Sequence, residues 1–114
     1  MSTADPGEPI TLAFVGHATP ALADRAAAYE DAVLPLLADH GARLLYRGRR
    51  KEGQDATLPF EVHVLWFPNR AAFDAYLVDD RRADLLRRFG EVFRSKQVVE
   101  VETIFGGATA IESR

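Results

Sequence analysis

The chain has 114 residues, of which 47% are hydrophobic and 27% charged, and its formal net charge is −3. This length predicts one domain, and the lack of a basic excess argues against nucleic acid as a partner. Cysteine is absent, which excludes disulfides, thiolate metal sites and a cysteine nucleophile, and favours a reducing cytoplasmic location. Residues 1–9 contain no basic leader, and no long apolar run follows them, so we expect neither a signal peptide nor a membrane span.

The first half of the chain predicts a strand, a helix and a second strand. Residues 10–17 are rich in strand formers, and Thr19-Pro20 is typical of a helix start. Apolar residues then recur at helical spacing along 20–40, at Leu22, Ala26, Tyr29 and Val33. Pro35 is expected to bend this helix near Asp31, and Gly41 to end it. Residues 43–49 are predicted to form the second strand.

The second half repeats this order. Residues 50–59 are polar and predict a long hairpin loop, and residues 60–67 alternate as a strand does. Asn69 is expected to cap the next helix, which Asp79-Asp80 interrupts before a further helical segment. Residues 97–105 are predicted to form the last strand.

The resulting βαββαβ order predicts an α+β fold of ferredoxin-like type. Because β-α-β connections are right-handed, both helical segments should cover one face of a four-stranded antiparallel sheet. The domain is expected to span residues 10–105, between a flexible N-terminal arm at residues 1–9 and a C-terminal tail at residues 106–114.

The uncovered face of this sheet predicts a homodimer. Strand alternation is expected to direct one residue in two of each strand toward the helices: Ile10, Leu12 and Phe14, Leu44 and Tyr46, Val62, Val64 and Trp66, and Val99 and Val101. The opposite face would then hold Val15, Leu45, Leu65, Phe67 and Ile104 among charged residues. An exposed surface of this kind usually meets a partner, and two copies packed face to face would close a barrel.

A family resemblance supports this layout. The passage Glu61-Val-His63-Val-Leu-Trp66-Phe-Pro68-Asn69, its continuation to Tyr76, and Asp79-Asp80-Arg81-Arg82 resemble the dimeric α+β barrel superfamily. The nearest likeness is to a small, largely uncharacterised group of stand-alone barrels, and a more distant one is to antibiotic-biosynthesis monooxygenases and EthD-like proteins. The resemblance implies a dimer, but the superfamily contains oxygenases, cyclases, haem enzymes and binding proteins, so it selects no function.

The haem-degrading branch of this superfamily resembles the chain at Trp66. That branch also needs a histidine on the second helix and a polar amide on the first strand. Residues 69–93 contain no histidine, and residues 10–17 contain no asparagine or glutamine. We therefore predict neither haem nor another cofactor.

His63 leads the first group of candidate catalytic residues. A hairpin turn near Gln54 would place Arg47 opposite Glu61, so that both flank His63. In a partly dry barrel His63 could act as a general acid or base, with His17 nearby, or it could be a hydrogen-bonded histidine of the dimer interface. Because no His-x-His or His-x3-His spacing occurs, no metal site is predicted.

The second candidate site lies between the sheet and the helices. Aromatic side chains expected there could line a flat ligand pocket or simply form a core: Tyr29, Tyr46, Trp66, Phe73 and Tyr76. The basic run Arg47, Arg49, Arg50 and Lys51 would be a solvated hairpin end or a lip that attracts an anion.

These features together suggest a small cytoplasmic homodimer that binds a hydrophobic, aromatic or polyketide-like molecule. Its chemistry would be cofactor-free oxygenation, cyclisation or proton transfer, which needs orientation and one acid or base. The alternative is a non-catalytic binding or structural homodimer.

Overall fold

A computed structural model describes residues 7–105 of the chain. The strands are β1 (Ile10–Ala18), β2 (Arg43–Arg49), β3 (Glu61–Phe67) and β4 (Phe93–Val101), and the α-helices are α1 (Ala23–Val33), α2 (Arg70–Leu77) and α3 (Asp80–Phe89). The expected tail at residues 106–114 and most of the expected arm lie outside the described residues. Among residues 7–105, no helix combines the length and apolar character needed to cross a membrane.

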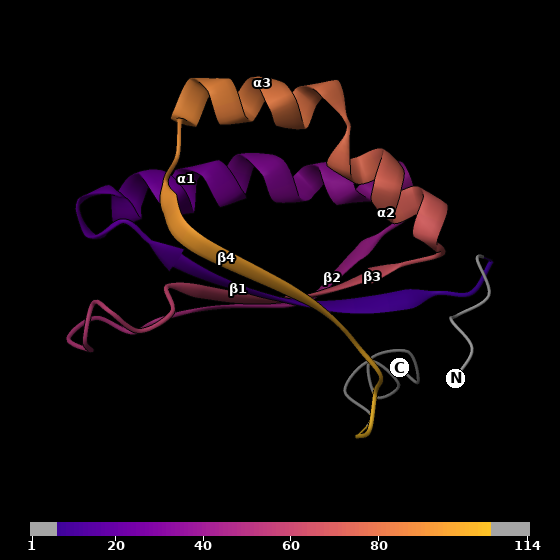
Figure 1. Cartoon of the computed structure of the whole chain (residues 1–114), viewed down its shortest axis with the longest axis horizontal. Helices are drawn as coiled ribbons and strands as arrows, with labels where there is room; N and C mark the ends of the chain where they lie inside the picture. The colour runs from indigo at the N-terminus through magenta and orange to yellow at the C-terminus, as the bar shows by residue number, and fades with distance from the viewer. Residues whose placement is uncertain (1–6, 106–114) are drawn as a thin grey trace.

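The four strands form one antiparallel sheet in the order β2-β3-β1-β4. Figure 1 shows the helices on one side of this sheet, with α3 beside α1, and no described element on the other side. The predicted βαββαβ order and the one-sided helical layer are therefore confirmed. The core lies between the two layers and is built from residues such as Leu12, Phe67, Tyr29, Val33 and Leu37.

The first helical region changes type where the sequence predicts a bend. A short 3₁₀ turn (η1, Pro20–Leu22) leads into α1, and a second 3₁₀ segment (η2, Leu34–His40) follows it. Pro35 lacks the N–H that would bond the Asp31 carbonyl, so the α-helical pattern stops at Val33. Gly41, at φ 69°, ends the segment in the left-handed region. Thr19 precedes η1 as expected, but its side chain forms no capping bond.

The second helical region is broken as the sequence predicts. Asn69 Oδ1 accepts a hydrogen bond of 2.8 Å from the Ala72 amide and caps α2. Asp79 Oδ1 accepts one of 2.8 Å from the Arg81 amide and caps α3. The last strand, however, begins at Phe93 and ends at Val101, four residues earlier than the predicted 97–105. The helix has already ended at Gly90, so Phe93 is free to pair with Ala18.

The predicted faces of β3 and β4 are wrong, and that of β2 is wrong from Tyr46 onward. A register shift between Leu44 and Tyr46 leaves Leu44 beside Leu65 on the helix-facing side, as predicted. In β1 the residues Ile10, Leu12 and Phe14 are buried, as expected. In β3, however, Leu65 and Phe67 are the buried residues, and Val62, Val64 and Trp66 face away from the helices. The register shows why: β3 pairs with β1 so that Phe67 lies beside Ile10, Leu65 beside Leu12 and His63 beside Phe14.

The neighbouring strands follow the same reversal. Tyr46 pairs with Val64, and Val99 pairs with Ala13, so both lie on the uncovered face and are 57% and 55% exposed. Val98 pairs with Phe14 and therefore faces the helices. The uncovered face thus carries Ala13, Val15, Tyr46, Val62, Val64, Trp66, Val99 and Val101.

Candidate functional site

A buried pair of hydrogen-bonded polar side chains lies on the helix-facing side of β3. Glu61 and His63 are two residues apart, so strand alternation directs both toward the helices. They are 0% and 2% exposed, and His63 Nε2 lies 2.6 Å from Glu61 Oε1. Charged residues are rarely this buried unless they have partners. This pair is therefore a specific structural feature rather than part of an ordinary apolar core.

Two arginines on the adjacent strand hold the Glu61 carboxylate. Arg47 binds it through Nε and Nη2, each at 3.0 Å, and Arg49 binds it through Nε at 2.7 Å. Arg47 also reaches α1, where its Nη1 donates to Asp31 at 2.9 Å. Burial alone would raise the pKa of the Glu61 carboxyl, but hydrogen bonds from the His63 ring and both guanidinium groups outweigh it and lower this pKa to about 2.

The ionised Glu61 determines how His63 can act. A carboxylate only accepts hydrogen bonds, so the His63 Nε2 must carry the hydrogen of the 2.6 Å bond. This leaves Nδ1 as the ring atom that can take up a proton. The His63 ring also stacks on Phe14, with ring centroids 4.6 Å apart.

The glycine at position 16 makes room for this stack. A Cβ at Gly16 would lie only 2.7 Å from the end of the Phe14 ring, closer than real side-chain contacts allow. Gly16 pairs with Glu61 on β3, so its missing side chain leaves space beside the pair of Glu61 and His63.

Glu30 on α1 faces this pair from the helical layer. Its side chain is 4% exposed, and no hydrogen bond to its carboxyl is found within the part of the chain that the structure describes. Burial raises the pKa of Glu30 to about 7, although the neighbouring His63 opposes the rise. Glu30 therefore exchanges a proton close to neutral pH, where acid–base catalysis is most effective.

Glu30, Glu61 and His63 form the cluster we call the acid–base cluster. One ligand atom from each lies within 4.8 Å of the others, a spacing that a metal ion would allow. However, both Glu61 oxygens already accept hydrogen bonds from guanidinium groups. A cation would have to lie beside these positive charges, so the arrangement favours proton chemistry over metal binding.

A cavity of about 170 Å³ opens beside the acid–base cluster. An engineered cavity of about 150 Å³ holds benzene, so this space fits about one ring. Its walls are mostly apolar, and polar side chains are interspersed among them. The lining residues are Leu12, Phe14, Tyr29, Glu30, Val33, Leu34, His63, Leu65, Phe73, Tyr76, Leu77, Arg82, Lys96 and Val98.

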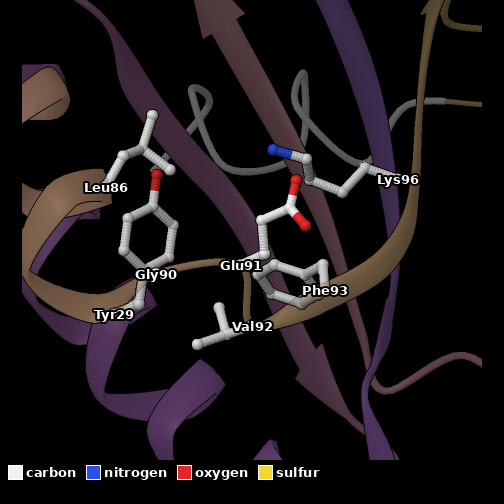
Figure 2. Close-up of a pocket in the computed structure, with 7 residues that line it drawn as sticks. All are labelled: Tyr29, Leu86, Gly90, Glu91, Val92, Phe93 and Lys96. Carbon is white, nitrogen blue, oxygen red and sulfur yellow. The ribbon is translucent and has the colours of Figure 1, made fainter.

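A second pocket, of about 410 Å³, shares Tyr29 and Lys96 with this inner cavity. Figure 2 shows it between the end of α3 and the start of β4, with the polar ends of Glu91 and Lys96 drawn toward each other. The two spaces therefore adjoin at these two side chains.

The structure divides the predicted site residues into two groups. Tyr29, Phe73 and Tyr76 line the inner cavity, as predicted for the aromatic pocket. Tyr46 and Trp66 lie on the opposite face of the sheet, where Arg43 lies over the Trp66 ring at 4.8 Å. Their predicted place in the pocket is wrong because β3 turns its other face to the helices and the register shift after Leu44 places Tyr46 beside Val64.

The predicted catalytic group is also rearranged. His63, Glu61 and Arg47 are in contact, but Arg47 pairs along the ladder with His63 and Arg49 with Glu61, a shift of two residues from the predicted register. His17 faces the uncovered side, where Nδ1 lies 3.2 Å from Ser95 Oγ, and so it does not join His63. The two predicted sites therefore merge into one, located between sheet and helices.

Sequence reasoning missed Glu30, Arg82 and Lys96. Glu30 directly follows Tyr29 within an amphipathic helix, so a wider buried helix face in the prediction would have included Glu30. Arg49, expected to be a solvated residue of the hairpin end, instead binds Glu61. Arg82 and Lys96 gave no separate signal, because isolated cations on predicted elements are usually exposed.

No family model and no curated protein matches the chain. Solved structures do match. A protein of unknown function from Rhodopseudomonas palustris is 15% identical, with a TM-score of 0.65 over 87% of this chain and 85% of that one. A proposed antibiotic biosynthesis monooxygenase from Bacteroides thetaiotaomicron is 10% identical, with a TM-score of 0.70 over 89% and 94%.

A third similar structure bears on the fold. It is a dimeric protein of unknown function with a ferredoxin-like fold from Bacteroides fragilis, 12% identical, with a TM-score of 0.64 over 83% of this chain and 96% of that one. These likenesses confirm the resemblance read from the sequence at the level of the fold. The chain has the ferredoxin-like α+β fold that these proteins share.

Proposed function

We propose that the chain works as a homodimer that binds a small, largely apolar molecule between sheet and helices and moves a proton on it. The observation that carries this proposal is the acid–base cluster at the wall of an apolar cavity. Ionisable groups are costly to bury, and strongly perturbed groups in a cavity are typical of catalytic sites.

The chemistry follows from the three residues of the cluster. Glu30, whose pKa is about 7, is present both as carboxylate and as carboxylic acid near neutral pH. In the carboxylate form it takes a proton from an acidic C–H or O–H of the bound molecule, and in the acid form it returns one. His63 shares this role through Nδ1, and Glu61 holds the ring in place.

The test is hydrogen–deuterium exchange on a one-ring ketone. Acetophenone in D₂O at saturating concentration should lose its methyl protons faster with protein than in buffer, as followed by proton NMR. Glu30→Gln and His63→Gln should each slow this exchange at least tenfold. His17→Gln makes the same change on the other face of the sheet and should leave the rate unaltered, with thermal melts confirming that all variants fold.

Exchange at the buffer rate with acetophenone bound would contradict the proton-transfer step. It would leave the chain as a non-catalytic binding protein, which is the alternative function. Acetophenone that fails to bind at all would contradict the cavity as a ligand site.

Oxygenation is a second candidate reaction at the same cluster. It is favoured by the similar structure from Bacteroides thetaiotaomicron that is described as a proposed monooxygenase. Deprotonation makes a phenol or enol electron-rich, which is the step that precedes reaction with O₂ without a cofactor. Oxygen uptake with a one-ring dihydroxybenzene, compared with exchange under argon, separates the two reactions.

The homodimer is supported by the uncovered sheet face. Apolar side chains dominate it, and Tyr46 and Val99 are more than half exposed. Contiguous exposed apolar surface of this kind marks an interaction site, and a second copy of the chain would cover it symmetrically. Light scattering should give twice the chain mass of 12.6 kDa, and a monomer at micromolar concentration would contradict the proposal.

A further inference from the structure

Two buried polar atoms at the inner cavity lack a well-aligned hydrogen bond among residues 7–105. They are the hydroxyl of Tyr29, which is 3% exposed, and the Nε of Arg82; the Arg82 side chain lies close enough to this hydroxyl to oppose the rise that burial causes in the Tyr29 pKa. Both residues line the cavity. Because nearly all buried polar groups in proteins are hydrogen-bonded, these two donors are available to a ligand.

Within the described part of the chain, the guanidinium of Arg82 forms no salt bridge. Its Nη1 donates to the Leu77 carbonyl at 3.1 Å, and its guanidinium lies over the Tyr76 ring at 4.7 Å. Among residues 7–105, no carboxylate forms an ion pair with it. The adjacent Arg81 differs, since it pairs with both Asp39 and Asp79.

The remaining groups at the cavity favour a negative ligand. Arg82 and Lys96 are its cationic residues, and Glu30 is its one carboxyl group within the described part of the chain. Since burial raises the pKa of Glu30 to about 7, this carboxyl is neutral in a large fraction of molecules. Burial also raises the pKa of Tyr76 to about 12 and raises that of Tyr29, so both hydroxyls are donors.

We propose that the inner cavity takes an organic acid of about one ring, with its carboxylate held by the Tyr29 hydroxyl and the Arg82 guanidinium. This inference rests on the proposed function, because it assigns the ligand class of the same cavity. The carboxylate lies at the donor end, and the rest of the molecule extends toward the acid–base cluster.

The test compares benzoate with benzamide, which has the same ring and size but no charge. Calorimetric titration at neutral pH should show benzoate binding at least tenfold more tightly. Arg82→Gln should abolish this preference, whereas Arg82→Lys should retain part of it. Arg87→Gln, on an exposed part of the same helix, should retain it fully.

Tyr29→Phe keeps the test valid if the Arg82 variants fail to fold. Removing a hydroxyl that forms no well-aligned hydrogen bond should change the melting temperature little, yet it should weaken benzoate binding several-fold and leave benzamide unchanged. Equal affinity for benzoate and benzamide in the unmodified protein would overturn this inference and leave the proposed function standing. Failure of both probes and of acetophenone to bind would overturn the proposed function itself.

Discussion

The two faces of the sheet differ in a way that the usual distribution of polarity does not predict. Along β3, the residues directed at the helices begin with Glu61 and His63, which are buried, whereas Val62, Val64 and Trp66 face away from the helices. A sheet with one covered face ordinarily buries its apolar residues and exposes its polar ones. The comparison teaches that the covered face buries two polar residues within an otherwise apolar core, whereas the uncovered face presents apolar residues of the kind that mark an interaction site.

Loss of the central carboxylate should have the largest effect on stability. Glu61→Ala leaves His63, Arg47 and Arg49 without their shared anion, and breaking such a buried pair costs roughly 3–5 kcal/mol. Urea denaturation measures the change. Glu52→Ala makes the same substitution in the exposed hairpin loop and should change stability by less than about 0.5 kcal/mol. A cost for Glu61→Ala as small as that of the control would show that the cluster is not buried as described.

Adjacent residues of β3 should respond in different ways. Leu65→Ala leaves a cavity beneath the helices and should lower the free energy of unfolding by roughly 2–4 kcal/mol. Trp66→Ala, on the uncovered face, should mainly weaken the dimer, so its effect should depend on protein concentration. Sedimentation over a dilution series, together with urea denaturation, separates the two. A concentration-independent loss for Trp66→Ala would place that side chain in the core instead.

The pH dependence of stability tests Glu30. Its pKa of about 7 exceeds the ordinary value of 4.5, so the unfolded chain loses this proton first and stability falls as pH rises between these values. Glu61 acts oppositely at lower pH: its stabilisation is present above its ordinary pKa of 4.5 and is lost as pH falls toward 2.

Glu30→Gln removes the group that titrates at the higher pH. Between about pH 5 and 8, the unmodified protein should lose roughly 1–3 kcal/mol of unfolding free energy through Glu30, and the variant should not show this loss. Urea denaturation at both pH values measures it. Parallel pH dependence in the two proteins would mean that Glu30 titrates normally, which would count against its role as an acid–base group.

Most of the fold could be predicted because the residues that begin, bend or end helices act locally, through their own chemistry. Pro35, Gly41, Asn69 and Asp79 each act through their own backbone or side-chain chemistry, and the structure places a change of element at each. The strand faces could not be predicted in this way. The odd-numbered and the even-numbered residues of β3 form two equally regular alternating sets. Placing the more polar set on the exposed face, as is usual, selected the wrong face.

The candidate site could be predicted only in part for the same reason. The proximity of Glu61, His63 and Arg47 follows from hairpin pairing, which brings residues of adjacent strands together. Glu30 joins them through the packing of α1 on the sheet, and that packing depends on which face of β3 is covered. A residue whose role comes from tertiary contact leaves no mark in local spacing.

The strand order also determines how two copies can meet without aggregating. β2 and β4 are the outer strands of the sheet, and unpaired edges are where sheets join edge to edge. β2 carries Arg43, Arg47 and Arg49, and β4 carries Arg94 and Lys96. Charged side chains on edge strands disfavour this joining of edges. Under the proposed homodimer, the apolar face is then the surface through which two copies form a closed pair rather than an open-ended polymer.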